Sequence, residues 1–83
     1  MKRADEIRSH ATRNYIEPAR AAGQSQVSIR AGDVAREMGL YGSLPSIVSA
    51  LGTLKFQRQA SVELIRTEGP LMGCNAVLTF RLL

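Results

Sequence analysis

The stretch VSIRAGDVAREMGL, residues 27–40, decides the fold because the spacing of its apolar side chains changes within it. Residues 27–30 alternate apolar and polar side chains and include two β-branched residues, which predicts a short strand. Apolar side chains then recur four apart over residues 31–38, which predicts a helix. Gly39 is placed to end this helix in the left-handed conformation, with Leu40 folding back onto it. We therefore expect a short strand that runs directly into a helix and a tight turn.

The next segment, SLPSIVSALG at residues 43–52, predicts a second helix over residues 44–51. The hydroxyl of Ser43 can accept hydrogen bonds from the first free backbone N–H groups of this helix. Its apolar positions follow the spacing i, i+3, i+4 and i+7 of a buried helix face. They are Leu44, Ile47, Val48 and Leu51. Gly52 and Thr53 interrupt the pattern, and residues 54–60 are expected to add one irregular or helical turn.

The flanking segments predict one helix before this pair and a hairpin after it. Residues 3–22 have helical spacing, and Pro18 should end or kink that helix near Ile16 because proline lacks the backbone donor. Over residues 62–68 and 76–82 the side-chain pattern repeats every two residues. This alternation predicts two strands joined by a loop of about seven residues.

These elements predict an α+β fold of one domain over residues 1–83, in the order helix, short strand, helix, helix and β-hairpin. Two helices joined by a glycine-containing turn form a helix-turn-helix unit. The hairpin should cover the remaining side of the helices, with the short strand paired along its edge. The expected core residues are Ile7, Ala11, Ile29, Val34, Met38, Ile47, Leu51, Leu64, Leu78 and Phe80.

The charge pattern favours a polyanionic partner. The net charge is +4, with 11 Lys and Arg residues against 7 Asp and Glu residues. Residues 1–22 and 55–83 each carry a net charge of +2, whereas residues 23–54 are neutral. Basic ends of this kind are compatible with nucleic-acid binding, but the same balance also occurs in proteins that bind none.

The same composition argues against an enzyme. Cys74 is the only cysteine and His10 the only histidine, which leaves no catalytic triad, metal cluster or phosphate-binding glycine loop. We expect Cys74 to be an idle thiol and His10 to face solvent or pack against Asn14. We therefore expect no cofactor, no metal, no small-molecule substrate and no membrane span, and a cytoplasmic location.

The runs VSIRAGDVAREMGL, SLPSIVSALG and VELIRTEG…NAVLTFRL together resemble the winged helix-turn-helix superfamily over about residues 5–83. This resemblance implies that residues 43–51 are the recognition helix and residues 69–75 the tip of the wing. It also implies a DNA-binding protein, either a small transcriptional regulator or an architectural factor, with double-stranded DNA as the partner. A homodimer is compatible with this interpretation.

The expected interface combines an uncharged helix with basic flanks. The outward positions of the second motif helix are Ser46, Ser49, Ala50 and Thr53, which indicates binding by shape with modest sequence preference. Basic residues around it would hold phosphates and set the register. The candidate DNA contacts are Arg30, Arg36, Ser43, Ser46, Ser49, Thr53, Lys55, Arg58 and Arg66.

Alternatives remain open at this point. Arg30 and Arg36 could pair with Asp33 and Glu37 on a solvated face, and Arg66 could guard a strand edge. The competing function is a protein-interaction or dimerisation module that uses the same fold without nucleic acid. RNA binding is a third, weaker option.

The assignment of the second motif helix gives a stability prediction. Ile47→Ala should lower the free energy of unfolding by about 2–5 kcal/mol, because it removes buried surface and leaves a cavity. Urea denaturation of both proteins measures the difference. A loss below about 0.5 kcal/mol, the usual size for a surface position, would show that the inward face of the helix is misassigned.

Overall fold

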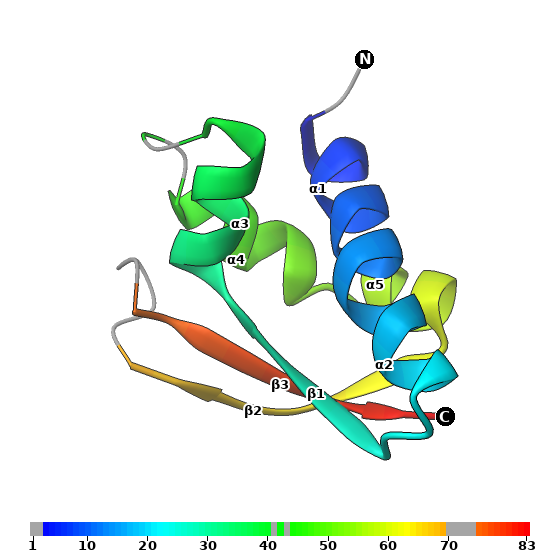
Figure 1. Cartoon of the computed structure of the whole chain (residues 1–83). Helices are drawn as coiled ribbons and strands as arrows, with labels where there is room; N and C mark the ends of the chain where they lie inside the picture. The colour runs from blue at the N-terminus through cyan, green and yellow to red at the C-terminus, as the bar shows by residue number, and fades with distance from the viewer. Residues whose placement is uncertain (1–2, 41, 43, 70–74) are drawn as a thin grey trace.

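Helices cover one face of a three-stranded antiparallel sheet in this α+β protein (Figure 1). The computed structural model describes residues 3–40, 42, 44–69 and 75–83. The helical elements are α1 (Arg3–Ala11), η1 (Thr12–Ile16), α2 (Glu17–Ala21), α3 (Ala31–Met38), α4 (Leu44–Leu51) and α5 (Leu54–Ala60). The strands are β1 (Gln26–Arg30), β2 (Val62–Glu68) and β3 (Val77–Leu82). The α+β class is thus confirmed, and the elements follow the predicted order with the regular helix α5 added before the hairpin.

The first helix passes Pro18 without ending. Between α1 and α2 the chain widens into the π-helical segment η1, in which the N–H of Glu17 donates to the carbonyl of Thr12, five residues back. A proline in a regular α-helix would collide with the carbonyl four residues earlier, and the wider turn accommodates it. The helix therefore does not end near Ile16; the predicted interruption takes the form of the π-helical segment that closes there, and Ile16 is a fully buried core residue.

The sheet has the order β1-β3-β2, so that the last strand of the chain lies in the middle. The short strand β1 pairs with the hairpin, as the sequence predicted; it lies antiparallel to β3, with Val27 opposite Phe80. The hairpin partner β2 pairs with the other side of β3, and its register shifts between Leu64 and Arg66. This irregularity leaves Ile65 as an extra residue, a β-bulge that bends the strand.

The turn between α3 and α4 begins as predicted. Gly39 has φ +69° and ψ +30°, the left-handed conformation that closes a helix. The N–H of Leu40 then donates to the carbonyl of Ala35 over 2.8 Å, and Leu40 packs against the core. At the other end of α3 the N–H of Ala31 donates to the carbonyl of Ala76, which ties the helix to the start of β3.

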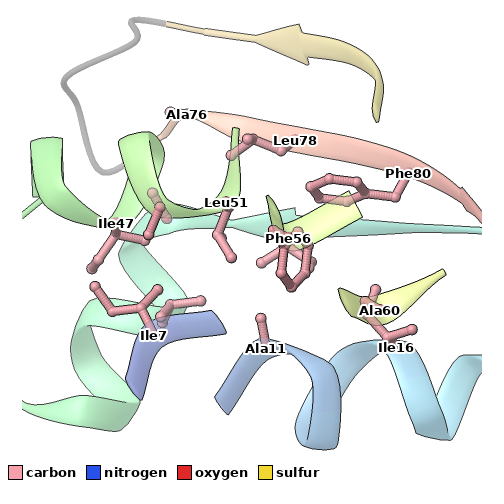
Figure 2. Packing of buried hydrophobic residues seen from close by; sticks show 14 of the residues in the cluster. Ile7, Ala11, Ile16, Ile47, Leu51, Phe56, Ala60, Ala76, Leu78 and Phe80 are labelled. Atoms are coloured by element: carbon pink, nitrogen blue, oxygen red, sulfur yellow. The ribbon is translucent and has the colours of Figure 1, made fainter. Parts of the chain in front are cut away.

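The core lies between the helices and the inner face of the sheet (Figure 2). Eight of the ten predicted core residues are fully buried, and Met38 and Leu64 are partly buried against them. Several buried residues were not predicted to contribute. They are Ile16, Ala19, Ala31, Ala35, Ala50, Phe56, Ala60, Val62 and Ala76.

The irregular or helical turn expected at residues 54–60 is the regular helix α5, which brings Phe56, absent from the predicted core, into the core. The side chain of Thr53 accepts a hydrogen bond from the backbone N–H of Phe56 over 3.2 Å and so caps the helix. Phe56 is fully buried and meets Phe80 edge to face, with ring centroids 5.3 Å apart (Figure 2). This aromatic contact joins α5 to the central strand.

The position of Phe56 gives a second stability prediction. Phe56→Ala should lower the free energy of unfolding by about 3–5 kcal/mol, since it removes a buried ring and leaves a cavity. Leu54→Ala is the matched control in the same helix, because the Leu54 side chain is 64% exposed, and it should change stability by less than about 0.5 kcal/mol. Equal losses from the two variants in urea denaturation would contradict the packing of α5 described here.

Candidate nucleic-acid interface

The exposed side of α4 carries small, uncharged residues. Ser46 and Ser49 are exposed, as predicted, and Pro45 lies beside them on the same side. On the opposite side of the helix Ile47 and Leu51 are fully buried. A backbone with small side chains can approach a partner closely, but this helix presents no charged group with which to recognise it.

Of the four expected outward positions, Ala50 is wrong, and Thr53, which follows the end of α4, is only partly exposed. Ala50 is only 2% exposed, because α1 packs across that side of α4 and its residue Ala4 shares a groove with Ala50. Thr53 is half-buried, and its hydroxyl donates to the carbonyl of Ala50 while it caps α5. The outward face of α4 is therefore narrower than the helical spacing suggested.

Arg30 and Arg36 lie on either side of one carboxylate at the start of α3. Nη1 of Arg30 lies 3.4 Å and Nη2 of Arg36 lies 3.3 Å from Oδ1 of Asp33. Arg30 also donates to Oδ1 of Asn75, beside the hairpin loop, over 2.6 Å. The alternative that Arg30 and Arg36 pair with acidic residues of α3 is confirmed for Asp33. It is wrong for Glu37, which contacts neither arginine in these ion pairs.

Lys55 and Arg66 each lie near one acidic residue. Nζ of Lys55 lies 3.5 Å from Oδ1 of Asp5 on α1, and Nε of Arg66 lies 3.5 Å from Oε1 of Glu68 on its own strand. The side chain of Lys55 is 68% exposed and that of Arg66 is 58% exposed. Ion pairs this exposed contribute little to stability, so both cations can exchange their partner for a phosphate at small cost.

Arg58 lies apart from the other basic candidates. It lines a groove of about 740 Å³ with Leu54 of α5 and with Glu63 and Leu83 of the hairpin. This is the end of the sheet opposite the hairpin loop (Figure 1). The structure therefore does not gather Lys55, Arg58 and Arg66 around one surface. Ser43 and the loop-tip residues Leu71, Met72 and Cys74 lie outside the described residues.

A buried arginine between α1 and α4 was not predicted as part of a site. Arg8 is 6% exposed, and its Nη2 donates to Oδ1 of Asp5 over 2.6 Å. Its Nε is shielded from solvent and has no acceptor among the described residues. Such a donor normally costs about 1–3 kcal/mol when it is left without an acceptor. The sequence signal was its place between Ile7 and Ala11, which both belong to the buried stripe of α1.

A second polar cluster links the first helix to α3. Nε2 of His10 donates to Oε1 of Glu37 over 2.7 Å, and the Tyr15 hydroxyl donates to Oε2 over 2.8 Å. Asn14 donates to the carbonyl of His10, so the expected packing of His10 against Asn14 is confirmed. The additional bond to Glu37 makes His10 a contact between helices.

The same hydrogen bonds shift two pKa values. Burial alone would raise the pKa of Glu37, but the bonds from His10 and Tyr15 outweigh it and hold the pKa below its ordinary value of 4.5. Burial, followed by the bond to Glu37, raises the pKa of Tyr15 well above its ordinary value. The charged form of Glu37 and the neutral form of Tyr15 are therefore the forms that the fold stabilises.

Comparisons with protein-family models, with curated proteins and with solved structures find no match for this chain. Within the described ranges, no helix has both the length and the apolar character needed to cross a membrane. The part of the chain that the structure describes also holds no group of three or more His, Cys, Asp or Glu side chains suited to a metal ion.

The Glu37 cluster gives a prediction for acid stability. A carboxylate with a lowered folded-state pKa stabilises the fold above its ordinary pKa, and this contribution disappears as the pH falls through the folded value. The free energy of unfolding should therefore decline as the pH falls below about 4.5, and Glu37→Gln should make that decline shallower. Urea denaturation at a series of pH values measures both.

Glu17→Gln is the matched control, because Glu17 is exposed on α2 and makes no side-chain hydrogen bond or ion pair with the described residues. It should leave the shape of the acid limb unchanged. An identical change in both variants would contradict the role given to Glu37.

Proposed function

We propose that this chain is a DNA-binding domain of the winged helix-turn-helix type, which holds duplex DNA against the exposed side of α4. The observation that carries the proposal is the arrangement around the motif: a helix pair joined by a Gly39 turn, followed by a hairpin whose last strand lies between β1 and β2. A helix that leaves one side uncovered at the surface is suited to the major groove, where base edges are accessible.

The charges support a partner with a phosphate backbone. The net charge is +4. Arg36 lies on α3, the helix that precedes α4 in the motif, and its side chain is 62% exposed. Lys55 and Arg66 are likewise exposed, and each is held only by a long surface ion pair. Phosphates compete well for such cations because binding releases the counterions of the DNA.

The chemistry of α4 favours modest sequence preference. Its exposed residues are Pro45, Ser46 and Ser49. The helix contains no arginine or lysine, the residues that most often contact guanine. We therefore propose a small regulator or architectural factor of the cytoplasm that recognises mainly the shape and backbone of the duplex.

One observation favours the competing function of a protein-interaction module. Leu54 is 64% and Leu83 is 72% exposed, and both line the apolar groove at the open end of the hairpin. Exposed leucines in a groove are typical of interaction surfaces. This hypothesis expects self-association that depends on concentration and no duplex binding tighter than about 10⁻⁴ M at physiological salt.

The direct test measures binding to random duplex DNA over a series of salt concentrations. The wild-type chain should bind with an affinity that falls steeply as salt increases, because of counterion release. Ser49→Glu should weaken binding at least about tenfold, since it places a carboxylate against the DNA backbone.

Gln24→Glu is the matched control, because it adds the same charge at an exposed position in the loop between α2 and β1. It should weaken binding far less than Ser49→Glu. Equal weakening would show that net charge alone matters and that α4 is not the binding surface. Absence of duplex binding would refute the proposed function.

A further inference from the structure

We propose that the outer edge of β1 is a pairing site for the same strand of a second copy of this chain. β1 is an outer strand of the sheet, so only one of its sides is hydrogen-bonded to β3. The other side of such a strand presents backbone N–H and C=O groups that can pair with another chain. The inference goes beyond the proposed function, because this pairing needs no DNA.

The hydrogen bonds at the two ends of β1 show which of its residues are bonded to the sheet. The carbonyl of Ser25 accepts from the N–H of Leu82 over 2.9 Å, and the N–H of Ala31 donates to the carbonyl of Ala76 over 2.9 Å. In an antiparallel pair only every second residue exchanges hydrogen bonds with the residue opposite. Counted from either end, the odd-numbered residues of β1 are therefore the ones bonded to β3.

The backbone groups of Gln26, Ser28 and Arg30 consequently face away from β3. The strand runs in front of β3 in Figure 1, and no described segment lies over it there. Arg30 is also the residue that precedes α3, so its carbonyl accepts the first hydrogen bond of that helix. The outer edge thus offers the N–H and C=O groups of Gln26 and Ser28 and the N–H group of Arg30.

The two edges of the sheet differ in how they are protected. The register of β1 with β3 is continuous, whereas that of β2 shifts at its bulge. Arg30 is the only charged residue of β1, and its Nη1 lies 3.4 Å from Oδ1 of Asp33. Bulges and charged side chains are the usual protection of an outer strand. The edge of β1 therefore lacks the protection that β2 has.

The pattern of outward groups is symmetric about Ser28, which makes the strand complementary to itself. In an antiparallel pair centred on this residue, the N–H of Ser28 donates to the Ser28 carbonyl of the second copy. The N–H of Arg30 likewise donates to the carbonyl of Gln26 in the second copy. The two Arg30 residues then lie at opposite ends of the pair, about 13 Å apart along the strands. This separation exceeds the screening length of about 10 Å at moderate salt, so the two charges repel little.

The side chains fit the same register. Val27 lies opposite the buried Phe80 on the inner face and is half-buried, so Ile29 of the second copy would cover its remaining surface. On the outer face the hydroxyls of Ser28 and Thr79 are hydrogen-bonded over 3.0 Å. A hydroxyl has one donor and two acceptor positions, so Ser28 can also bond the Ser28 hydroxyl of the second copy. Both faces of the sheet would thus continue across the pair.

The paired region is small, so we expect a weak dimer. A strand of five residues on each side buries less than the roughly 1,200 Å² at which stable interfaces begin. The dissociation constant should lie on the order of 10⁻⁴ M. The chain is then monomeric in the dilute solutions used for urea denaturation.

Sedimentation equilibrium and NMR hydrogen exchange of the whole chain, at concentrations up to about 1 mM, test the proposal. The mass should rise toward that of a dimer, and the N–H groups of Ser28 and Arg30 should become protected over the same concentrations. The N–H of Gln26 should gain far less protection, because the carbonyl that would accept from it is used by α3. A monomer at all concentrations would overturn the proposal, and so would a dimer in which exchange at Ser28 is unchanged.

Variants of the strand then assign the dimer to this edge. Ser28→Pro removes the central donor and should weaken association at least about tenfold. That N–H faces away from β3, so the substitution removes no hydrogen bond within one copy. Ser28→Ala is the matched control, because it keeps the N–H, and it should weaken association far less. Equal association of Ser28→Pro and the wild type would overturn the proposal.

A charge variant keeps the test decisive where Ser28→Pro does not fold. Gln26→Lys places a charge opposite Arg30 of the second copy and should weaken association, whereas Gln24→Lys adds the same charge in the loop before the strand and should not. A dimer that Leu54→Ala abolishes and Gln26→Lys leaves intact would overturn the proposal in favour of the leucine groove. These measurements contain no DNA, so their failure leaves the duplex titration of the proposed function unaffected.

Discussion

The fold depends on the docking of β3 between β1 and β2. This strand is the last element of the chain, yet it supplies the hydrogen bonds on both sides of the sheet. Residue 27 pairs with residue 80, so the chain closes a loop of some fifty residues before β1 has a partner. Leu78 and Phe80 on the same strand are buried on the inner face of the sheet, against which the helices pack. Sheet formation and core formation are thus one event, and neither β1 nor the helix layer is complete without this strand.

Local chemistry allowed much of this arrangement to be predicted. The change of spacing within residues 27–40, the glycine at position 39 and the alternating hairpin strands each have one favoured structure, and the folded chain adopts all three. Two features were predicted incompletely, the helix around Pro18 and the helix that begins after Thr53, because in each case a second local effect competes with the one used for the prediction. Pro18 predicted an end or a kink of the helix, and the chain instead widens into a π-helical turn that accommodates the proline and keeps Ile16 in the core. Thr53 looked like part of a break, although a threonine before an apolar run is also a helix cap.

The candidate site was harder to predict than the fold, because it depends on which elements pack side by side. The sequence indicated that Ser46 and Ser49 face outward, and they do. It gave no sign that α1 covers Ala50, since that contact joins residues far apart in the chain. The basic residues illustrate the same limit. Their number was evident from the sequence, but the position of Arg58 at the far end of the sheet depends on where α5 docks.

The bulge at Ile65 has a consequence for how the protein behaves at high concentration. β2 is an edge strand, and a flat edge with free backbone groups invites pairing with another chain. The bulge interrupts the regular ladder within this strand, and the exposed charged side chains of Glu63, Arg66 and Glu68 flank it. A second copy approaching this edge would meet a bent backbone and a row of solvated charges. This edge of the sheet is therefore protected against pairing with a strand of another molecule, the step that leads to aggregation.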